Sequence, residues 1–264
     1  MKEIILSYLP KSHPWRQQIH CFDTIDSTNT RAKEMALAGA PHGTVLIADR
    51  QTGGRGRMGR CFHSPAGLGV YMSVILRPNC PMEALMHLTC AAAVAACDGV
   101  ETSAGIRPGI KWTNDLVCGK HKIAGILTEL VTAGSEYCAI VGIGINCCQN
   151  DSDFPPEIRD MAASLAMVTG KEVCREHVAA ALISALQEMD AALLSGKDAM
   201  LKRYRESCIT LGKDIQLLRS GEIRYGHALS VDENGALEVL FPDGHREFVQ
   251  SGEVSIRGMY GYSS

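Results

Sequence analysis

Residues 51–60 restrict the fold more than any other segment, because four glycines alternate with three arginines there. The run directly follows a predicted strand at residues 44–48, so we expect it to form a loop. Glycine lets the backbone approach a ligand closely, and arginine guanidinium groups bind carboxylates and phosphates through paired hydrogen bonds. The run predicts a mobile loop that closes over an anion. A solvated loop and an RNA-binding arginine segment are the alternatives.

The first two hundred residues alternate short apolar strands with a few helices. Strands are predicted at residues 19–25, 44–48, 70–76, 106–112, 123–130 and 137–145. Helices are predicted after Ser27, at residues 82–98 and at residues 175–194, from apolar side chains three and four residues apart. The fourth and fifth strands are expected to pair across a turn at residues 114–121. The pattern predicts an α+β fold with helices on one side of a sheet.

The character of the sequence changes near Leu211, where short strand patterns follow one another without helices. These strands are predicted at residues 215–217, 221–229, 237–241, 247–249 and 254–256. Turn signals such as Asn234-Gly235 separate them. We expect a small β-barrel appended to the large domain, with domains at residues 1–210 and 211–264.

Composition excludes several classes of protein. The chain has 264 residues and a net charge of −3, without the basic excess of a dedicated nucleic-acid binder. Its central apolar stretch, residues 84–97, is shorter than a membrane span, and the N-terminus lacks the pattern of a signal peptide. The eleven cysteines include no Cys-x-x-Cys pair, so no metal site is predicted by direct motif, and reduced cytoplasmic thiols are expected.

A second polar cluster, residues 111–115, follows the strand at residues 106–112. Lys111, Asn114 and Asp115 place a cation, an amide and a carboxylate within five residues. Asn114 and Asp115 are suited to hold a phosphate-bound Mg²⁺, or Asp115 to take a proton from an incoming amine. A type I turn is the alternative.

Lys122 opens the apolar strand at residues 123–130, and Gly125 follows where a ligand can lie against the backbone. A hairpin between Lys111 and Lys122 would bring two cations to the same end of the sheet. Gly142 and Gly144 lie on one face of a later strand that ends at Asn146, which indicates that something packs on that face. A dinucleotide fingerprint is excluded, because the third glycine and the following helix are missing.

In this order the segments resemble the biotin–protein ligases. The family pattern begins with Ser-Thr-Asn at a helix start, as in Ser27, Thr28 and Asn29. It continues with Gly-Arg-Gly-Arg-x-Gly-Arg, Lys-Trp-Pro-Asn-Asp, Lys-x-Ala-Gly-Ile-Leu-x-Glu and Gly-Ile-Gly-Ile-Asn. The matching segments here are residues 54–60, 111–115, 122–129 and 142–146. The resemblance extends from about Cys21 to Ile256, and five motifs in order are more specific than any one of them.

Three residues depart from the family pattern. Met58 stands where an arginine is common, Thr113 replaces the usual proline, and Phe62 lies where tryptophan is frequent. Phe62 is still expected to stack on or cover the adenine. None of the three departures removes a residue to which chemistry is assigned.

The resemblance implies a ligase that activates biotin with Mg·ATP and transfers it to a lysine of a biotin carboxyl carrier domain. The implied fold is a mixed sheet with helices on one side and a C-terminal SH3-like barrel. The implied catalytic residues are Lys122, Arg57 and Asp115. The implied biotin-binding residues are Ser27, Thr28, Asn29, Gln51, Arg55, Gly56, Arg57, Lys122, Gly125 and Gly142. The implied ATP- or adenylate-binding residues are Arg57, Arg60, Phe62, Lys111, Asn114, Lys122 and Asn146.

Other functions are compatible with parts of the sequence. Some family members carry an N-terminal winged helix-turn-helix, but only some twenty residues precede the first motif at Asp26, so no DNA binding is expected. A lipoate or octanoate ligase and a non-catalytic adenylate-binding sensor are the alternatives. Homodimers are frequent in the family, and no residue here decides the oligomeric state.

Overall fold

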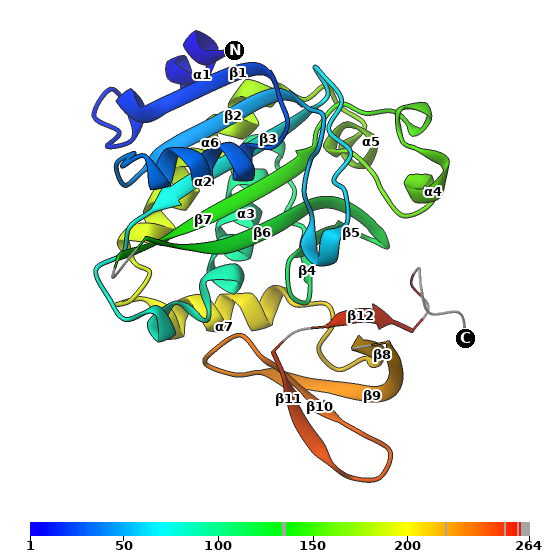
Figure 1. The fold of residues 1–264 in the computed structure, drawn as a ribbon. Helices are drawn as coiled ribbons and strands as arrows, with labels where there is room; N and C mark the ends of the chain where they lie inside the picture. Colours follow the sequence, from blue (N-terminus) through cyan, green and yellow to red (C-terminus); the bar gives the residue numbers. More distant parts are fainter. Residues whose placement is uncertain (134–135, 220, 251, 258, 260–264) are drawn as a thin grey trace.

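The chain forms two β-sheets of different size, with helices packed around the larger one (Figure 1). The structure is a computed structural model, and it describes residues 1–133, 136–219, 221–250, 252–257 and 259. The seven-stranded sheet has the order β1-β2-β3-β7-β6-β5-β4. Its strands are β1 (Ile19–Ile25), β2 (Thr44–Gln51), β3 (Gly69–Leu76), β4 (Gly109–Lys111), β5 (Asp115–Cys118), β6 (His121–Ala133) and β7 (Glu136–Asn146). The sheet is mixed, because β1 and β2 are parallel and the other neighbours are antiparallel.

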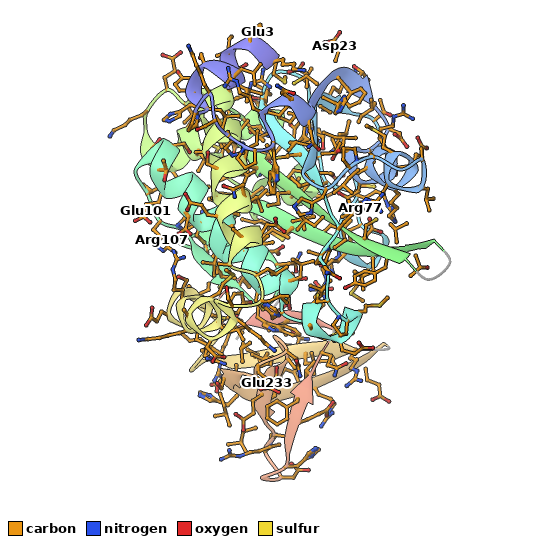
Figure 2. All side chains as sticks on the ribbon, turned by 90° about the vertical axis from the view of Figure 1, so that its left-hand side faces the viewer. Glu3, Asp23, Arg77, Glu101, Arg107 and Glu233 are labelled. Atoms are coloured by element: carbon orange, nitrogen blue, oxygen red, sulfur yellow. The ribbon has the colours of Figure 1, made fainter. Side chains whose placement is uncertain are left out.

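Helices cover both faces of this sheet, so the expectation of helices on one side is wrong. Helices α3 (Leu88–Ala104) and α6 (Arg175–Ala191) cover one face, and α2 (Thr28–Leu37) lies on the other (Figures 1 and 2). The reason lies in β3, in which all eight residues are buried. A strand with apolar side chains on both faces needs a covering layer on each side.

The predicted strands occur within three residues of their predicted bounds, but the chain folds differently from the prediction around residues 106–121. The expected turn at residues 114–121 contains the strand β5, which lies between β4 and β6 in the sheet. The chain reverses more tightly than expected, at Gly119, whose φ of 58° lies in the left-handed region that glycine tolerates. Lys111 and Lys122 therefore lie on β4 and β6, with β5 between them.

The alanine-rich helix is displaced from its predicted position. A 3₁₀ turn covers Met82–Leu85, and α3 then runs from Leu88 to Ala104, where Gly105 ends it with φ of 71°. Taken together with the preceding 3₁₀ turn, Met82–Ala104 is the one helical segment in the described part of the chain that is long and apolar enough to cross a membrane. However, 72% of its apolar window is buried within the molecule, as in a core helix.

Some helices were not predicted, because their apolar positions are few. They are α1 (Lys2–Tyr8), α4 (Pro156–Arg159), α5 (Leu165–Thr169) and α7 (Lys197–Ser207), together with 3₁₀ turns at Arg16–Gln18, Arg57–Gly59 and Asp151–Asp153. Of these, α7 leads into the second sheet.

The second sheet contains the five C-terminal strands that the sequence predicts. They are β8 (Asp214–Arg219), β9 (Glu222–Val231), β10 (Leu237–Leu240), β11 (Arg246–Val249) and β12 (Glu253–Ile256). The sheet is antiparallel, with the order β11-β10-β9-β8-β12. Trp112 ties it to the large sheet, because its indole Nε1 donates a hydrogen bond of 3.0 Å to the Gly235 carbonyl.

Candidate active site

A cavity of about 420 Å³ lies between the large sheet, residues 51–60 (the arginine–glycine loop) and the strand β12. Every residue that the sequence analysis assigned to catalysis, biotin or ATP lines this cavity. They are Ser27, Thr28, Asn29, Gln51, Arg55, Gly56, Arg57, Arg60, Phe62, Lys111, Asn114, Asp115, Lys122, Gly125, Gly142 and Asn146. Segments up to about 120 residues apart in the chain therefore meet at one place.

Glycines form the floor of the cavity. Gly125 on β6 is paired with Gly144 on β7, and Gly142 lies two residues further along the same face. A Cβ atom at Gly142 would lie 2.0 Å from Asn29 Oδ1, and one at Gly144 would lie 2.5 Å from the Phe62 ring. Side chains are excluded here because Asn29 and Phe62 pack directly on the backbone.

One end of the floor carries uncharged polar groups. Gln51 Oε1 accepts hydrogen bonds from the backbone N–H of Thr28 (2.8 Å) and from its hydroxyl (3.1 Å). The Ser73 hydroxyl lies 2.6 Å from Asn29 Oδ1 and 2.8 Å from the Thr28 hydroxyl. Ser27 caps α2, and its Oγ accepts from the Thr30 N–H at 3.4 Å. The side chains at this end can form hydrogen bonds with the donors and acceptors of a small polar head group.

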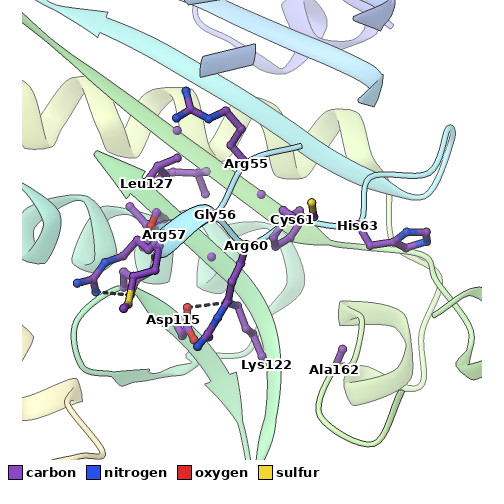
Figure 3. A pocket seen from close by; sticks show the side chains of 18 of the residues that line it. Arg55, Gly56, Arg57, Arg60, Cys61, His63, Asp115, Lys122, Leu127 and Ala162 are labelled. Atoms are coloured by element: carbon purple, nitrogen blue, oxygen red, sulfur yellow. Dashed lines mark hydrogen bonds and ion pairs between the residues drawn. The ribbon is translucent and has the colours of Figure 1, made fainter. Parts of the chain in front are cut away.

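The other end gathers positive charge around Asp115 and Glu253. Lys122 Nζ lies 2.7 Å from Asp115 Oδ1 (Figure 3). Lys111 is 6% exposed, and burial lowers the pKa of its ammonium group. The Asp115 charge opposes this shift of the pKa, and the Lys122 charge adds to it. A site of this kind attracts an anion and stabilises negative charge that develops on it.

The arginine–glycine loop crosses the mouth of the cavity, and each of its three arginines contacts another segment of the chain. Arg55 Nη2 lies 3.4 Å from a carboxylate oxygen of Glu129. Arg57 Nη1 donates a hydrogen bond of 2.9 Å to Asn114 Oδ1, and Arg60 pairs with Glu253 of β12. The three partners belong to β6, the β4–β5 connection and the second sheet, so the loop bridges both parts of the molecule.

Asn146 and Phe62, two of the predicted ATP-binding residues, pack against other parts of the cavity wall. Asn146 is 5% exposed; its Nδ2 donates to the Ala163 carbonyl at 3.2 Å, and its Oδ1 accepts from Gln149. The Phe62 ring rests on Gly144 and lies edge-on to Tyr71, with ring centroids 6.3 Å apart. Asn146 thus supports the wall of the cavity, and Phe62 covers part of its floor.

Several residues that build the site were not predicted from the sequence. Ser73 and Glu129 hold polar groups of the floor in place, and Glu253 holds the loop. Glu129 belongs to one of the five motifs, so its position was a usable signal. Nothing local marks Ser73 or Glu253, because their partners are distant in the chain.

No group of three or more histidines, cysteines and carboxylates that could hold a metal ion occurs among residues 1–133, 136–219, 221–250, 252–257 and 259. Every cysteine is a free thiol.

Comparison with known proteins places the chain in a family. A model of the biotin/lipoate A/B protein ligase family matches residues 21–146. Biotin–[acetyl-CoA-carboxylase] ligase of Mycobacterium tuberculosis is 31% identical over 249 residues, which cover 91% of this chain and 89% of that protein. The chain belongs to the biotin/lipoate protein ligase family. Another relative, the bifunctional ligase/repressor BirA of Bacillus subtilis, is 37% identical over 229 residues, covering 86% of this chain and 70% of BirA.

Solved structures of the family have the same architecture. Biotin protein ligase from Aquifex aeolicus in complex with biotin and ATP aligns with a TM-score of 0.78 and 30% identity. The alignment covers 91% of this chain and 99% of that one. The fold described above, a mixed sheet with helices and a second antiparallel sheet, is therefore the fold of a biotin protein ligase.

Proposed function

We propose that this chain is an ATP-dependent biotin–protein ligase that attaches biotin to a lysine of a biotin carboxyl carrier domain. One observation carries the proposal: all five family motifs line one cavity, with an uncharged polar end and a cationic end joined by a glycine floor. This layout suits a ligand with a polar ring at one end, an apolar body and a carboxylate that must react with a phosphate. The similarity to ligases named for biotin supports the same reading.

In the first step, an oxygen of the biotin carboxylate attacks the α-phosphorus of Mg·ATP. The bond from that phosphorus to the bridging oxygen of the β-phosphate breaks, giving biotinyl-5′-AMP and pyrophosphate. Two anions must approach each other, so cations have to neutralise the transition state. Lys122 is our first candidate for contact with both the carboxylate and the α-phosphate. Arg57 and Arg60 are assigned to clamp the phosphates from the loop.

In the second step, the amine of the carrier lysine attacks the acyl carbon of the mixed anhydride. The bond from that carbon to the AMP oxygen breaks, and the amine loses a proton. Asp115 is the proposed acceptor of the proton, because its carboxylate lines the cavity beside Lys122. The loop would keep water and bystander amines from the reactive adenylate until the carrier arrives.

The remaining assignments concern the ends of the site. Ser27, Thr28, Asn29 and Gln51 would bind the ureido ring, and Gly125 and Gly142 would accept the bicyclic body. Lys111, Asn114 and Asn146 would face the nucleotide, with Mg²⁺ entering as part of the Mg·ATP substrate. Phe62 would cover the adenine.

We further propose that the chain divides into a catalytic domain, residues 1–210, and an SH3-like domain, residues 211–264. The second sheet, whose first strand begins at Asp214, supports this division. Contact between Glu253 and Arg60 supports a role for the C-terminal domain in closing over ATP and receiving the carrier. Free thiols throughout the chain support work in the cytoplasm.

The test is adenylate formation by the purified protein with α-labelled ATP, Mg²⁺ and either biotin or lipoate. We expect labelled acyl-AMP with biotin, which then transfers to a carrier domain and fails to transfer to a carrier whose target lysine is replaced by arginine. Product with lipoate alone would overturn the choice of substrate. Tight biotin binding without any adenylate would indicate a sensor and would overturn the ligase.

A further inference from the structure

Glu129 of β6 lies beside the end of the cavity that Asn29 lines but does not itself line the cavity, and it contacts three different side chains. Its Oε2 accepts a hydrogen bond of 2.9 Å from Asn29 Nδ2. Its Oε1 lies 2.6 Å from Lys33 Nζ and 3.4 Å from Arg55 Nη2. Its side chain is 18% exposed. One largely buried carboxylate therefore connects α2, β6 and the arginine–glycine loop.

The first consequence concerns the orientation of the Asn29 amide. An ionised carboxylate can only accept hydrogen bonds, so the Asn29 NH₂ group must face Glu129, and the Leu127 carbonyl accepts from the same group at 3.2 Å. Asn29 Oδ1 must then face Ser73 and the glycine floor at Gly142. Glu129 and the Leu127 carbonyl together orient Asn29 so that it offers an acceptor, not a donor, at this point of the floor.

The second consequence concerns the first arginine of the loop. Arg55 points away from the Lys122 end of the cavity (Figure 3), and its ion pair with Glu129 connects the loop to β6. Burial favours the neutral form of Glu129, but hydrogen bonds from Lys33 and Asn29 outweigh it and hold the pKa of the carboxyl below its usual value. The anion is therefore present at neutral pH to hold both partners.

We propose that Glu129 is a positioning residue for the recognition of biotin: it sets the Asn29 amide and Arg55 in their binding orientations without touching the reacting atoms. This inference rests on the proposed function. The two groups that Glu129 holds lie at the polar end, whereas the cations assigned to chemistry lie around Asp115 at the other end. Loss of Glu129 should therefore weaken biotin binding and leave the chemical step nearly unchanged.

A purely structural role predicts a different result. Lys33 and Asn29 lie one turn apart on α2, so Glu129 could simply dock that helix onto β6. Lys33→Met tests this, because it removes the shortest ion pair of Glu129 and keeps the contacts to Asn29 and Arg55. If docking is the role, Lys33→Met should impair the protein as much as Glu129→Gln does.

The experiment measures KM for biotin and kcat of adenylate formation, biotin affinity by calorimetry, and thermal unfolding, for wild type, Glu129→Gln and Lys33→Met. Glutamine has the same shape but replaces one accepting oxygen by a donor. We expect KM and Kd for biotin to rise tenfold to a hundredfold, roughly the effect of losing a charged hydrogen bond, with kcat within about twofold. Lys33→Met should stay within about threefold of wild type in all of these quantities.

A double-mutant cycle with Arg55→Met tests whether Glu129 affects biotin binding through Arg55. If Glu129 acts partly through Arg55, the two substitutions together should weaken biotin binding by less than the product of their separate effects. If Glu129→Gln does not fold, Glu129→Asp replaces it, because aspartate keeps the charge but is one methylene group shorter. The same rise in KM for biotin, with kcat nearly unchanged, is expected. Unchanged KM in both Glu129 variants, an equal loss in Lys33→Met, or a loss confined to kcat would overturn the inference. Wild-type protein that makes no adenylate with biotin would instead overturn the proposed function.

Discussion

Lys122 carries the largest electrostatic demand in the proposed first step, because it must oppose charge on a carboxylate and a phosphate at once. Its Nζ is paired with Asp115 at 2.7 Å in this structure, which holds the ammonium group at the cationic end of the cavity. We predict that Lys122→Ala raises the barrier to adenylate formation by about 3–4 kcal/mol, the cost of losing one transition-state contact. Pyrophosphate release under saturating biotin and Mg·ATP measures this effect.

Lys120 provides the matched control for that measurement. It lies two residues away in the turn between β5 and β6, and its side chain is exposed. Lys120→Ala removes the same charge from the same hairpin, but outside the cavity, and should leave the rate within about twofold of wild type. Equal rates for the two variants would contradict the assignment of Lys122.

Lys111 leads to a prediction about pH. Burial lowers the pKa of its ammonium group, so Lys111 loses its proton at a lower pH than an exposed lysine does. If its charge supports nucleotide binding or reaction, adenylate formation should fall on the alkaline side below the ordinary lysine value of about 10.4. In Lys111→Arg, the guanidinium group stays charged beyond pH 12, so this fall should move to higher pH. A pH profile of kcat/KM for ATP tests this; an identical alkaline fall in both proteins would exclude Lys111 as its origin.

At the scale of elements, the glycine floor depends on the side chains that pack on it. Alanine at Gly142 would bring a Cβ atom to 2.0 Å from Asn29 Oδ1, so Asn29 or the strand must move. We predict that Gly142→Ala weakens biotin binding at least tenfold and lowers the free energy of unfolding by about 1–3 kcal/mol, as overpacking does. Calorimetric titration with biotin and denaturant unfolding measure the two effects.

Gly53→Ala is the matched control for the floor. A Cβ atom there would lie 3.6 Å from the Asp26 carbonyl oxygen, an ordinary contact, and Gly53 does not line the cavity. Its biotin affinity should match that of wild type. If Gly142→Ala bound biotin equally well, the floor would not be the biotin-binding surface.

Element by element, the sequence predicted the structure where the local pattern and the tertiary environment agree. Strands β1 and β3 and the C-terminal strands have clear apolar or alternating patterns and were found nearly at their boundaries. Strand β5 was missed because Asn114, Asp115 and Gly119 give it the composition of a turn. Helix α7 was not predicted because its apolar face is short. That face contains only three buried residues, Met200, Leu201 and Tyr204.

At the scale of the whole molecule, the sequence could predict that the motifs meet at one site. It could not predict which residues outside the motifs contact them. The residues of the cavity come from motifs that each carry a local signal of glycine, arginine or lysine at a fixed spacing. The contact between Arg60 and Glu253 joins residues 193 positions apart, and no local signal marks a glutamate in a C-terminal strand. The placement of helices on both faces has the same origin, because it depends on what packs against β3.

The cysteines test the arrangement of the whole molecule in a single experiment. Cys61 and Cys174 are exposed, and only Cys61 lines the cavity. Burial raises the pKa of Cys90 and of Cys97 to about 12, so those thiols should stay unreactive until the protein unfolds. We predict that a thiol reagent labels Cys61 and Cys174 first in the native protein.

Bound ligands should change the labelling rate of one exposed thiol, Cys61, and not that of the other, Cys174. Biotin with Mg·ATP, at concentrations well above their dissociation constants, should slow labelling of Cys61 roughly tenfold or more by occupying the cavity. Labelling of Cys174, at the start of α6, should not change, so each molecule carries its own control. Mass spectrometry of labelled peptides follows both sites, and Cys61→Ser identifies the protected peptide. Equal protection of both thiols would indicate a global change in place of a filled cavity, and unchanged labelling of Cys61 would place the ligands elsewhere.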